Sequence, residues 1–445
     1  MKNVLKKSLA LILVFALSLS GTFVSYAQTY SDYVSEHDLF VEERGLEFVE
    51  NYFRSIELLE FLLDAFPQDN LGRNVFPENL GGVYIDDYGN LVILVVENYL
   101  SNENNMFVRA LVSEGVVARE VAFAYNDLWE VFDFLNDFIP NNQDNLAASN
   151  ADGIWLNVIG NQVVVTLAEY TEEQVNRFRE MVLDSPILGF MQSPGRPTSY
   201  IDYEYSYLED LYYNGIALTE DLAIESLNIT RVYPGDILYL RRPNGTLARG
   251  GSIGYRVRIN IGGRGEQVGF TTAAHIGQGV DSLGRLIRNG DRVYNRNGTH
   301  IGTVQITHRD TADVAVITMA PNIQATNITL SGSVLPRQAP STVGVRVIAT
   351  GMSGLRRVGY IRGSWAGNTG SGWTNGMRAS YTSQRGDSGG MVYSWTSATN
   401  NGVNGIHVTG WREDENFSQW ADGGNALFTV VNIHFPRIGN SVRLY

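Results

Sequence analysis

Hydrophobic positions between residues 28 and 70 recur at three- and four-residue steps, which predicts an amphipathic helical segment. The positions that carry this pattern are Leu46, Val49, Phe53, Ile56, Leu59 and Leu63. Two apolar runs within 82–96 then flank the polar stretch 86–90, as in a β-hairpin. A second helical stretch follows near 128–138, and Pro140 is expected to lie just beyond its end.

The hairpin-plus-helix pattern occurs a second time further along the chain. Apolar runs at 153–158 and 162–167 flank a short turn, and Thr171 is a candidate N-cap for the helix that follows. The apolar face of that helix would carry Val175, Phe178 and Val182. Three prolines in 186–231 discourage long elements, so this stretch is predicted to be an acidic and aromatic connector.

After about Val232 the pattern changes to short apolar runs separated by Gly or Asn-Gly turns. The predicted strands are 237–240, 255–261, 268–273, 292–294, 302–307, 314–318, 343–350, 358–363, 390–394, 405–408 and 426–431. Many short strands at regular spacing predict an all-β domain, a sandwich or a barrel. Its roughly 214 residues are enough to bury a real core.

The first 27 residues have the pattern of a secretory signal peptide. Three lysines precede an apolar run at 9–17, and small residues end at Ala27, so cleavage is expected before Gln28. The apolar run is short for a membrane span, which disfavours a membrane anchor. We therefore expect a secreted, extracellular protein with no membrane association.

These patterns divide the chain into three predicted parts. They are a signal peptide at 1–27, an acidic α+β segment at 28–231 with subdomains at about 28–145 and 146–231, and an all-β domain at 232–445.

The two segments after the signal peptide carry opposite charge. Residues 28–231 hold 36 Asp and Glu against 9 Lys and Arg, a net charge of −27. Residues 232–445 hold 11 against 21, a net charge of +10. Opposite charges attract and select each other, which makes the first segment a candidate partner of the second, although a solvated acidic surface also explains its charge. The arginines are scattered and form no nucleic-acid-binding motif, so no nucleic acid is expected as a partner.

The chain has no cysteine, which excludes disulfides, thiolate zinc sites and a cysteine nucleophile. Its six histidines show no metal-ligand spacing, so neither a metal nor a cofactor is expected. An exported protein of this kind must be held together by packing or by a high barrier to unfolding.

Three local patterns in the predicted β domain carry candidate chemistry, in the chain order His, Asp, Ser. They are Phe270-Thr271-Thr272-Ala273-Ala274-His275, Ala312-Asp313-Val314-Ala315-Val316-Ile317 and Gly386-Asp387-Ser388-Gly389-Gly390. Each alone has a structural explanation, such as a glycine-rich β-turn or a strand histidine. Together, in an exported all-β chain, they favour a Ser-His-Asp triad. The side chains that compete for these roles without such a context are His300, His308 and Asp310.

The chemistry requires each of these residue types. His275 would take the proton of the Ser388 hydroxyl and then protonate the leaving amine, while Asp313 would orient the imidazole and stabilise its charged form. The N–H groups of Gly386 and Ser388 would form the oxyanion hole. Asp387 would be buried and would hold the loop in shape.

At these residues the chain resembles the chymotrypsin-like serine peptidases, most closely the streptogrisin and α-lytic protease branch of bacteria. The stretch Tyr233-Pro234-Gly235-Asp236-Ile237-Leu238-Tyr239 is similar to the start of that branch's mature enzyme, and Arg437 to Tyr445 to its end. The resemblance covers about 232–445. It implies a trypsin-like fold of two antiparallel six-stranded β-barrels.

Residues 28–231 resemble, more loosely, the pro-regions of the same branch, which also contain hairpin-plus-helix units. Such pro-regions act as folding catalysts and inhibitors and are then removed, which fits the charge difference between the segments. The chain departs from the streptogrisin pattern in having no cysteines, and this affects the loops around the specificity pocket.

The resemblance also bears on the residue preferred before the cleaved bond. It places Thr382 at the base of the pocket, where a trypsin-like enzyme carries Asp, so preference for Lys or Arg is not expected. Gly405-Ile406-His407 resembles the glutamyl endopeptidases, in which a histidine and a small hydroxyl residue, here Ser383, receive an acidic side chain. The pocket walls would be Thr409 and Gly410, with Gly423 and Gly424 on the far side. Cleavage after Glu or Asp is one interpretation, and a strand histidine beside a broad apolar pocket is the other.

The sequence therefore predicts a secreted serine endopeptidase made as a zymogen, which acts as a monomer on protein or peptide substrates. Its own pro-region would be an intramolecular chaperone and inhibitor. Two alternatives stay open, an inactive protease fold used for binding or adhesion and hydrolysis of esters. The absence of a Gly-x-Ser-x-Gly motif disfavours an α/β-hydrolase.

Overall fold

The computed structural model describes most of the chain between residues 36 and 444. The described residues are 36–69, 73–97, 106–195, 229–241, 247–260, 265–277, 289–308, 312–329, 332–352, 356–369, 373–383, 386–397, 400–410, 426–430 and 443–444. The predicted signal peptide, most of the connector, Asp310, Gly423 and Gly424 lie outside them. The chain divides into two compact units, residues 1–127 and 128–445. The domain boundaries proposed from the sequence stay predictions.

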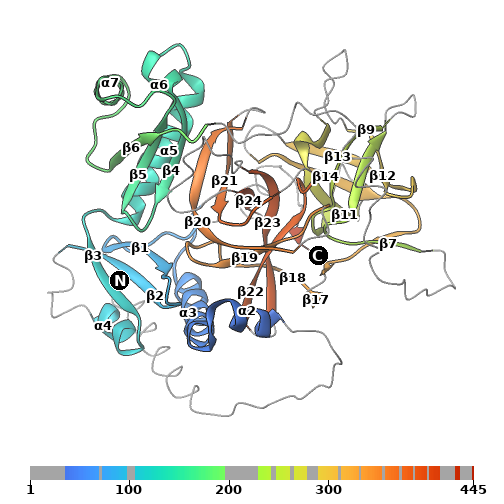
Figure 1. Cartoon of the computed structure of the whole chain (residues 1–445), viewed down its shortest axis with the longest axis horizontal. Coiled ribbons are helices and arrows are strands. Elements are labelled where there is room, and N and C mark those ends of the chain that lie inside the picture. The colour runs from blue at the N-terminus through green and yellow to red at the C-terminus, as the bar shows by residue number, and fades with distance from the viewer. Residues whose placement is uncertain are drawn as a thin grey trace. The chain divides into compact units, whose positions relative to one another are not determined.

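In the first unit, the helical region predicted from the sequence forms α2 (Glu36–Arg44) and α3 (Leu46–Ala65) (Figure 1). The buried face of α3 consists of Phe48, Val49, Tyr52, Ser55, Ile56, Leu59 and Leu62. Val49, Ile56 and Leu59 were predicted on this face, whereas the predicted Leu46 is exposed. The predicted hairpin is β1 (Leu80–Ile85) and β2 (Leu91–Val96). Its turn is fastened to α3 because the Ser55 hydroxyl donates to the Gly89 carbonyl oxygen at 2.7 Å.

Two elements of this unit were not predicted from the sequence. After the hairpin, the chain forms α4 (Met106–Ser113) and then β3 (Val117–Val121), which pairs with β2 in parallel. The result is a three-stranded sheet in the order β1-β2-β3. Only one of the five β3 residues is fully buried, so β3 lacks the apolar run that marks the two hairpin strands.

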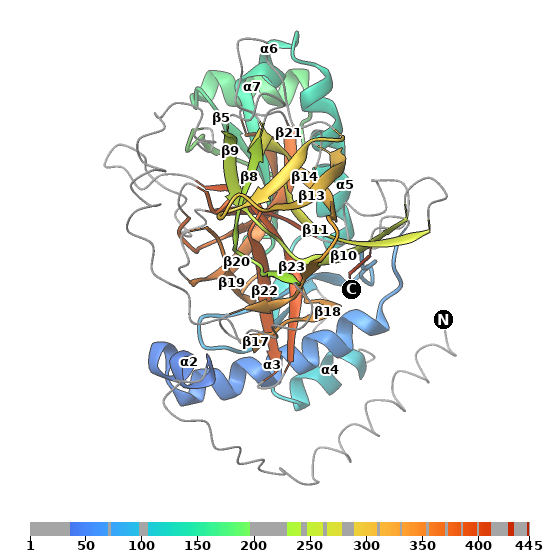
Figure 2. The same cartoon turned by 90° about the vertical axis from the view of Figure 1, so that its right-hand side faces the viewer.

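The second hairpin belongs to a similar arrangement. The elements are α5 (Tyr125–Asn141), α6 (Leu146–Asn150), β4 (Ala151–Asn157), β5 (Gln162–Leu167), α7 (Glu172–Met181) and β6 (Leu188–Gln192). The predicted N-cap is confirmed, since the Thr171 side chain accepts a hydrogen bond from the Gln174 N–H at 3.3 Å. In Figure 2, α6 and α7 lie near β5.

Two predictions about this region were wrong. Pro140 lies inside α5 rather than beyond it. Only one helical residue follows Pro140, so its missing N–H removes a single hydrogen bond of the last turn. Part of the predicted connector is the strand β6, which pairs with β5 in parallel from Leu188 onward. Pro186 precedes this strand and leaves its ladder of hydrogen bonds intact.

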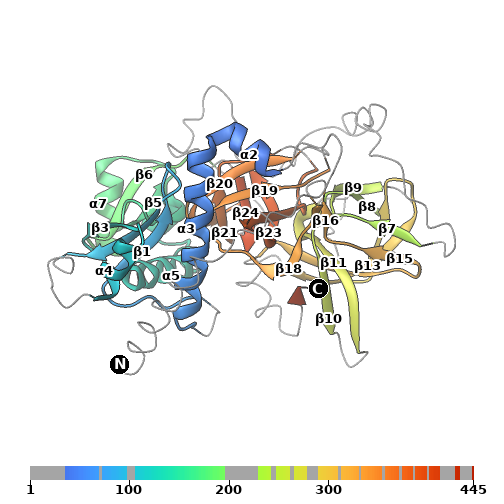
Figure 3. The same ribbon diagram turned by 90° about the horizontal axis from the view of Figure 1, so that it is seen from below.

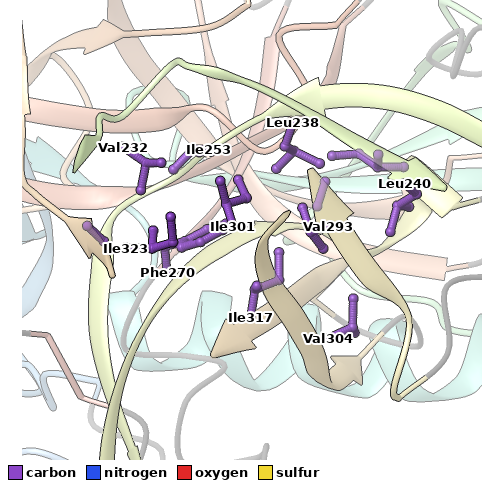
Figure 4. Close-up of a cluster of buried hydrophobic side chains, with 13 residues drawn as sticks. Val232, Leu238, Leu240, Ile253, Phe270, Val293, Ile301, Val304, Ile317 and Ile323 are labelled. Atoms are coloured by element: carbon purple, nitrogen blue, oxygen red, sulfur yellow. The ribbon is translucent and has the colours of Figure 1, made fainter. Parts of the chain in front are cut away.

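The catalytic candidates lie among two large sheets. The first has the strand order β25-β10-β11-β14-β13-β12-β8-β9. Its strands are β8 (Ile237–Arg241), β9 (Leu247–Ser252), β10 (Arg256–Asn260), β11 (Glu266–Ala273), β12 (Arg292–Asn295), β13 (His300–His308), β14 (Val314–Met319) and β25 (Arg443–Leu444). Side chains from many of them, among them Leu238, Val293 and Ile317, form one apolar cluster (Figure 4). Burial of this cluster is the main stabilising contribution in a region without cysteines.

The second sheet contains β19 (Arg346–Ala349), β20 (Arg357–Asn368), β21 (Trp373–Ala379), β22 (Met391–Ser397), β23 (Asn400–Gly410) and β24 (Ala426–Val430), with β18 (Leu335–Gln338) paired to β23. Shorter pairs are β7 (Thr230–Val232) with β15 (Ile323–Ala325), and β16 (Ile328–Thr329) with β17 (Gly332–Ser333). Every strand predicted from the sequence here overlaps an observed strand. The strands missed from the sequence are β7, β9, β15, β16, β17, β18, β21 and β25. The predicted all-β architecture preceded by α+β units is confirmed.

The second sheet continues into the hairpin of the acidic segment, because β4 pairs with β20 in antiparallel fashion (Figures 1 and 3). Trp365 lies opposite Trp155, and Gly367 opposite Gly153. The two glycines permit this close approach, since a Cβ on Gly367 would lie 2.6 Å from the Asp152 carbonyl oxygen. The sheet order therefore runs on from β20 through β4 and β5 to β6.

Two side chains of β21 also contact the acidic segment. The guanidinium of Arg378 lies over the Trp155 ring at 4.4 Å from its centroid. The Trp373 indole N–H donates to Asn136 Oδ1 at 2.8 Å.

None of the helices in the described ranges is both long and apolar enough to cross a membrane.

Candidate active site

The pairing of β11 with β14 brings the candidate base and its orienting carboxylate together. The two strands are antiparallel, with Ala273 opposite Val314. Because they run in opposite directions, the residue after the end of β11 meets the residue before the start of β14. His275, in the 3₁₀ turn that follows β11, thus lies beside Asp313, and the Ala274 N–H donates to the Asp313 carbonyl oxygen at 3.1 Å.

The Asp313 carboxylate holds His275 at two points. Oδ1 accepts from the His275 backbone N–H at 2.7 Å, and Oδ2 lies 2.5 Å from Nδ1 of the ring. Asp313 is buried and has a φ of 47°, in the left-handed region that Asp tolerates better than most residues. With Nδ1 held by the carboxylate, Nε2 is left to face the nucleophile.

The candidate nucleophile, Ser388, lies in a glycine-rich turn before β22. The turn is fixed to β23 because the Gly389 N–H donates to the His407 carbonyl oxygen and the His407 N–H donates to the Gly390 carbonyl oxygen, both at 2.8 Å. Gly386 has a φ of 88°, and a Cβ there would lie 2.1 Å from Cε of Met352. The Met352 side chain is flexible, so it is the positive φ that favours glycine at this position.

The structure brings the three predicted side chains together. His275 Nε2 lies 3.0 Å from Ser388 Oγ, within hydrogen-bond distance, while its Nδ1 faces Asp313. The Ser388 hydroxyl also lies 3.1 Å from the Val408 carbonyl oxygen, so its proton has two acceptors within reach. A nucleophile, a base and an orienting carboxylate in this order can carry out acyl transfer.

The histidine of the predicted specificity pocket is also in a defined setting. His407 is buried, and its Nδ1 lies 3.0 Å from the Tyr381 hydroxyl. Burial, and then the charge of His275, lower the pKa of His407 to about 3. Burial, and then the charge of buried Asp387, hold the pKa of Tyr381 well above its usual value. Both groups are therefore neutral at pH 7.

Among the other predicted pocket residues, Thr382 is exposed and Ser383 is partly buried. Thr409 is buried, and its hydroxyl has no hydrogen-bond partner among the described residues. Gly410 is buried at the end of β23. Arg357, on β20, was not singled out from the sequence. Its Nη1 lies 3.5 Å from the Thr382 hydroxyl, and its buried Nε and Nη2 have no partner within the described ranges.

The competing histidines have other settings. His300 Nε2 lies 2.9 Å from the Gly302 carbonyl oxygen, on β13, and its ring contacts Tyr294. His308 ends the same strand. In the part of the chain that the structure describes, no group of three or more His, Asp or Glu side chains is arranged to hold a metal ion.

Sequence reasoning missed three side chains at this site, and no local pattern would have revealed them. They are Ser252 on β9, Arg357 on β20 and Tyr381 after β21. Each contributes through a partner more than 20 residues away along the chain. Tertiary folding alone brings such pairs together.

Comparison with family models identifies the acidic segment. Residues 46–117 match the model described as a Pro-like N-terminal domain, and residues 126–193 match the Pro-like C-terminal domain. These residues form a pro-region of the α-lytic protease type. The two models cover the two hairpin-plus-helix units, so the predicted resemblance of this pro-region is confirmed.

Solved structures similar to the chain include several proteases. Protease A of Thermobifida fusca is 20% identical over 48% of this chain and 100% of its own, with a TM-score of 0.35. A Nocardiopsis protease is 22% identical over 48% and 99%, with the same TM-score. A glutamic acid specific serine protease, described as using a histidine triad in substrate binding, is 19% identical over 48% and 100%, again with a TM-score of 0.35. A search of curated proteins found no match.

Proposed function

We propose that the chain is a secreted serine endopeptidase, made as a zymogen, with His275, Asp313 and Ser388 as its catalytic triad. The observation that carries this proposal is that the imidazole ring of His275 contacts both Ser388 and Asp313. Nε2 lies 3.0 Å from Ser388 Oγ, and Nδ1 lies 2.5 Å from Asp313 Oδ2. The pro-region that precedes the site supports the zymogen.

The proposed reaction follows from this geometry. Nε2 of His275 takes the hydroxyl proton as Ser388 Oγ attacks the carbonyl carbon of the substrate. The negative charge that forms on the carbonyl oxygen is stabilised by the N–H groups of Gly386 and Ser388. When the C–N bond breaks, the leaving amine takes the proton from Nε2. Water then hydrolyses the acyl-enzyme with the same base, while Asp313 keeps the imidazole in its orientation.

The pro-region would act as chaperone and inhibitor of this enzyme. Its strand β4 extends a sheet that contains β22 and β23, the strands on which the nucleophile's turn is fixed. Its net charge of −27 opposes the +10 of residues 232–445. Self-cleavage would release the protease, at a junction predicted anywhere between Glu220 and Arg249.

The test is the intact mass of the purified wild type beside Ser388→Ala after incubation. We expect the wild type alone to fall to a fragment that begins near Val232, because only it has the nucleophile. If both proteins stay full length, the self-processing proposal fails. If both are cut alike, a foreign protease does the processing.

A fluorophosphonate reagent separates the enzyme from the inactive binding module. Reaction at Ser388 in the wild type, absent in His275→Ala, requires a base-activated hydroxyl. An unreactive wild type that stays folded would favour the binding module.

For the residue before the cleaved bond, we propose a preference for Glu, with Asp second. The hydroxyl of the buried, neutral Tyr381 lies 3.0 Å from His407 Nδ1, and we infer that it donates there, which would leave the proton of the neutral ring on Nε2. In this proposal Nε2 donates to the carboxylate of the substrate residue. The Arg357 guanidinium, 3.5 Å from the Thr382 hydroxyl, adds positive charge beside the residue predicted at the base of the pocket.

Peptides that differ only at this residue test the preference, with Glu, Gln, Asp, Phe and Leu compared by kcat/KM. We expect Glu to exceed Gln at least tenfold in the wild type. His407→Leu should remove most of this ratio, whereas His300→Leu, a control on a strand histidine, should leave it unchanged. Preference for Phe or Leu in the wild type would establish the broad apolar pocket instead.

A further inference from the structure

Ser252, the last residue of β9, is buried and makes four hydrogen bonds around the nucleophile's turn. Its N–H donates to the Ser388 carbonyl oxygen at 2.8 Å, and its hydroxyl donates to the Gly386 carbonyl oxygen at 2.6 Å. The Met352 N–H donates to the same hydroxyl oxygen at 2.7 Å. The Ser252 carbonyl oxygen accepts from Thr272 Oγ1 at 2.9 Å.

The direction of the Ser252 hydroxyl proton is fixed by its neighbours. The Met352 backbone N–H can only donate, so it occupies a lone pair of the hydroxyl oxygen. The Gly386 carbonyl can only accept, so the single hydroxyl proton must point at it. The hydroxyl is thus a link of defined polarity between the segment at residue 352 and the turn that carries the nucleophile.

The two carbonyls that Ser252 holds belong to the two residues proposed to supply the oxyanion-hole N–H groups. Gly386 adopts a φ of 88° and, as a glycine, has access to other backbone conformations at little cost. A change in its backbone would move the N–H groups away from a common target. Anchoring the carbonyls of Gly386 and Ser388 from one residue restricts this freedom, and preorganised donors are what stabilise an oxyanion.

We propose that Ser252 is a positioning residue for the oxyanion hole, which acts by holding the backbone of Gly386 and Ser388. The proposal rests on the proposed peptidase function. Ser252 would affect catalysis although its side chain touches neither the substrate nor the triad side chains. It lies on β9 of the first sheet, whereas the turn that carries Ser388 leads into β22 of the second sheet.

The experiment compares Ser252→Ala with Ser394→Ala, both made in the full chain. Ser394 is equally buried, and its hydroxyl donates to Asn404 Oδ1 at 2.5 Å, away from residues 386–388. Active sites are counted with a fluorophosphonate, so that kcat refers to competent enzyme. We expect Ser252→Ala to lower kcat about 30-fold with KM within twofold, and Ser394→Ala to change each less than threefold. We expect a smaller fall in kcat than the roughly 100- to 1,000-fold effect of removing one oxyanion-hole donor, because both N–H donors are still present in Ser252→Ala.

A second readout isolates the oxyanion hole. A peptide boronic acid forms a tetrahedral adduct with the nucleophile, whereas the product-like peptide acid does not. Ser252→Ala should weaken the boronic acid about 30-fold and leave the peptide acid within twofold. A residue needed only for folding would lower the number of active sites without changing this ratio.

The outcomes separate the two proposals. Ser252→Ala with kcat and boronic acid affinity like those of Ser394→Ala overturns the positioning role while the peptidase stands. A wild type that neither hydrolyses peptides nor reacts with the fluorophosphonate overturns both. If Ser252→Ala does not fold, Ser252→Cys, which keeps a weaker donor, is used. We expect its kcat to fall threefold to tenfold, and no change in kcat would overturn the role.

Discussion

The two hairpin-plus-helix units of the pro-region have the same local pattern but different tertiary uses. In each unit a hairpin is followed by a helix and then by a strand that joins the hairpin in parallel. Within the described residues, β1 pairs only with β2, whereas β4 pairs with β5 on one side and with β20 on the other. Periodicity within a hairpin therefore does not reveal whether its outer edge is used.

The outer edges of β1 and β4 differ because the strand β20 lies opposite β4. Gly82-Val83-Tyr84-Ile85 in β1 corresponds in register to Gly153-Ile154-Trp155-Leu156 in β4, since Tyr84 and Trp155 each lie opposite a valine. Trp155 lies beneath Arg378 and opposite Trp365. The partner of β4 is about 200 residues away in the chain, and an added edge strand binds mainly through backbone groups that any sequence has.

The largest expected effect comes from placing a larger side chain between β4 and β20. Gly153→Val, in a separately produced segment of residues 28–231, should weaken inhibition of the processed protease about 100-fold. A Cβ at residue 153 would lie 3.0 Å from the Trp365 indole nitrogen and 3.3 Å from the Ala366 carbonyl oxygen, and overpacking of this kind costs roughly 1–3 kcal/mol. Inhibition constants measure the effect. Thermal unfolding of the segment alone shows whether the unit itself remains intact.

Next in size is the loss of the aromatic side chain on the paired edge. Trp155→Ala should weaken inhibition about 30-fold, because it removes the ring under Arg378 together with its buried area. The matched control is Tyr84→Ala, the corresponding residue of the first unit, which should lower the stability of that unit and change the inhibition constant less than threefold. Equal effects of the two substitutions on inhibition would show that the two edges are used alike.

The smallest expected effect concerns the stability of the β strands that carry the candidate site rather than the hairpin units. It is predicted at Asp236, the residue before β8. Burial raises the pKa of Asp236 to about 6, although its carboxylate accepts from the Tyr233 N–H at 2.7 Å. The folded chain therefore binds this proton more tightly than the unfolded chain, and the resulting stabilisation is lost as pH rises through about 4 to 6. Asp236→Asn in a Ser388→Ala background should raise the free energy of unfolding by about 1 kcal/mol at pH 7.5, because part of the gain is offset by burying an amide.

Urea unfolding at pH 7.5 and at pH 3.5 checks the prediction for Asp236. Asp236→Asn should no longer stabilise the protein at pH 3.5, where the carboxyl is protonated in the folded chain and mostly protonated in the unfolded chain, so that only the cost of burying the amide remains. A stabilisation that is equal at both pH values would mean that the carboxyl proton is not its cause.

Much of this protein was accessible from its amino-acid sequence because the relevant signals are local. The two hairpins, the Thr171 cap and the strands around residues 237–431 follow from periodicity and turn residues. The pattern of His275, Asp313 and Ser388 was recognisable because each catalytic residue borders a strand or a glycine-rich turn with its own short motif. The α5 end and β6 were misjudged because proline was weighed without its position in the element.

Tertiary structure alone decided which distant segments meet. It brought Asp313 beside His275 through the register of β11 and β14, and Tyr381 within hydrogen-bond distance of His407. It also paired β4 with β20. It also gave Ser252 its hold on Gly386, 134 residues away. These contacts use backbone groups, single hydroxyls and single rings, whose types occur throughout the chain. Local sequence therefore carries no mark of them, and only the packing of the two sheets selects which ones form.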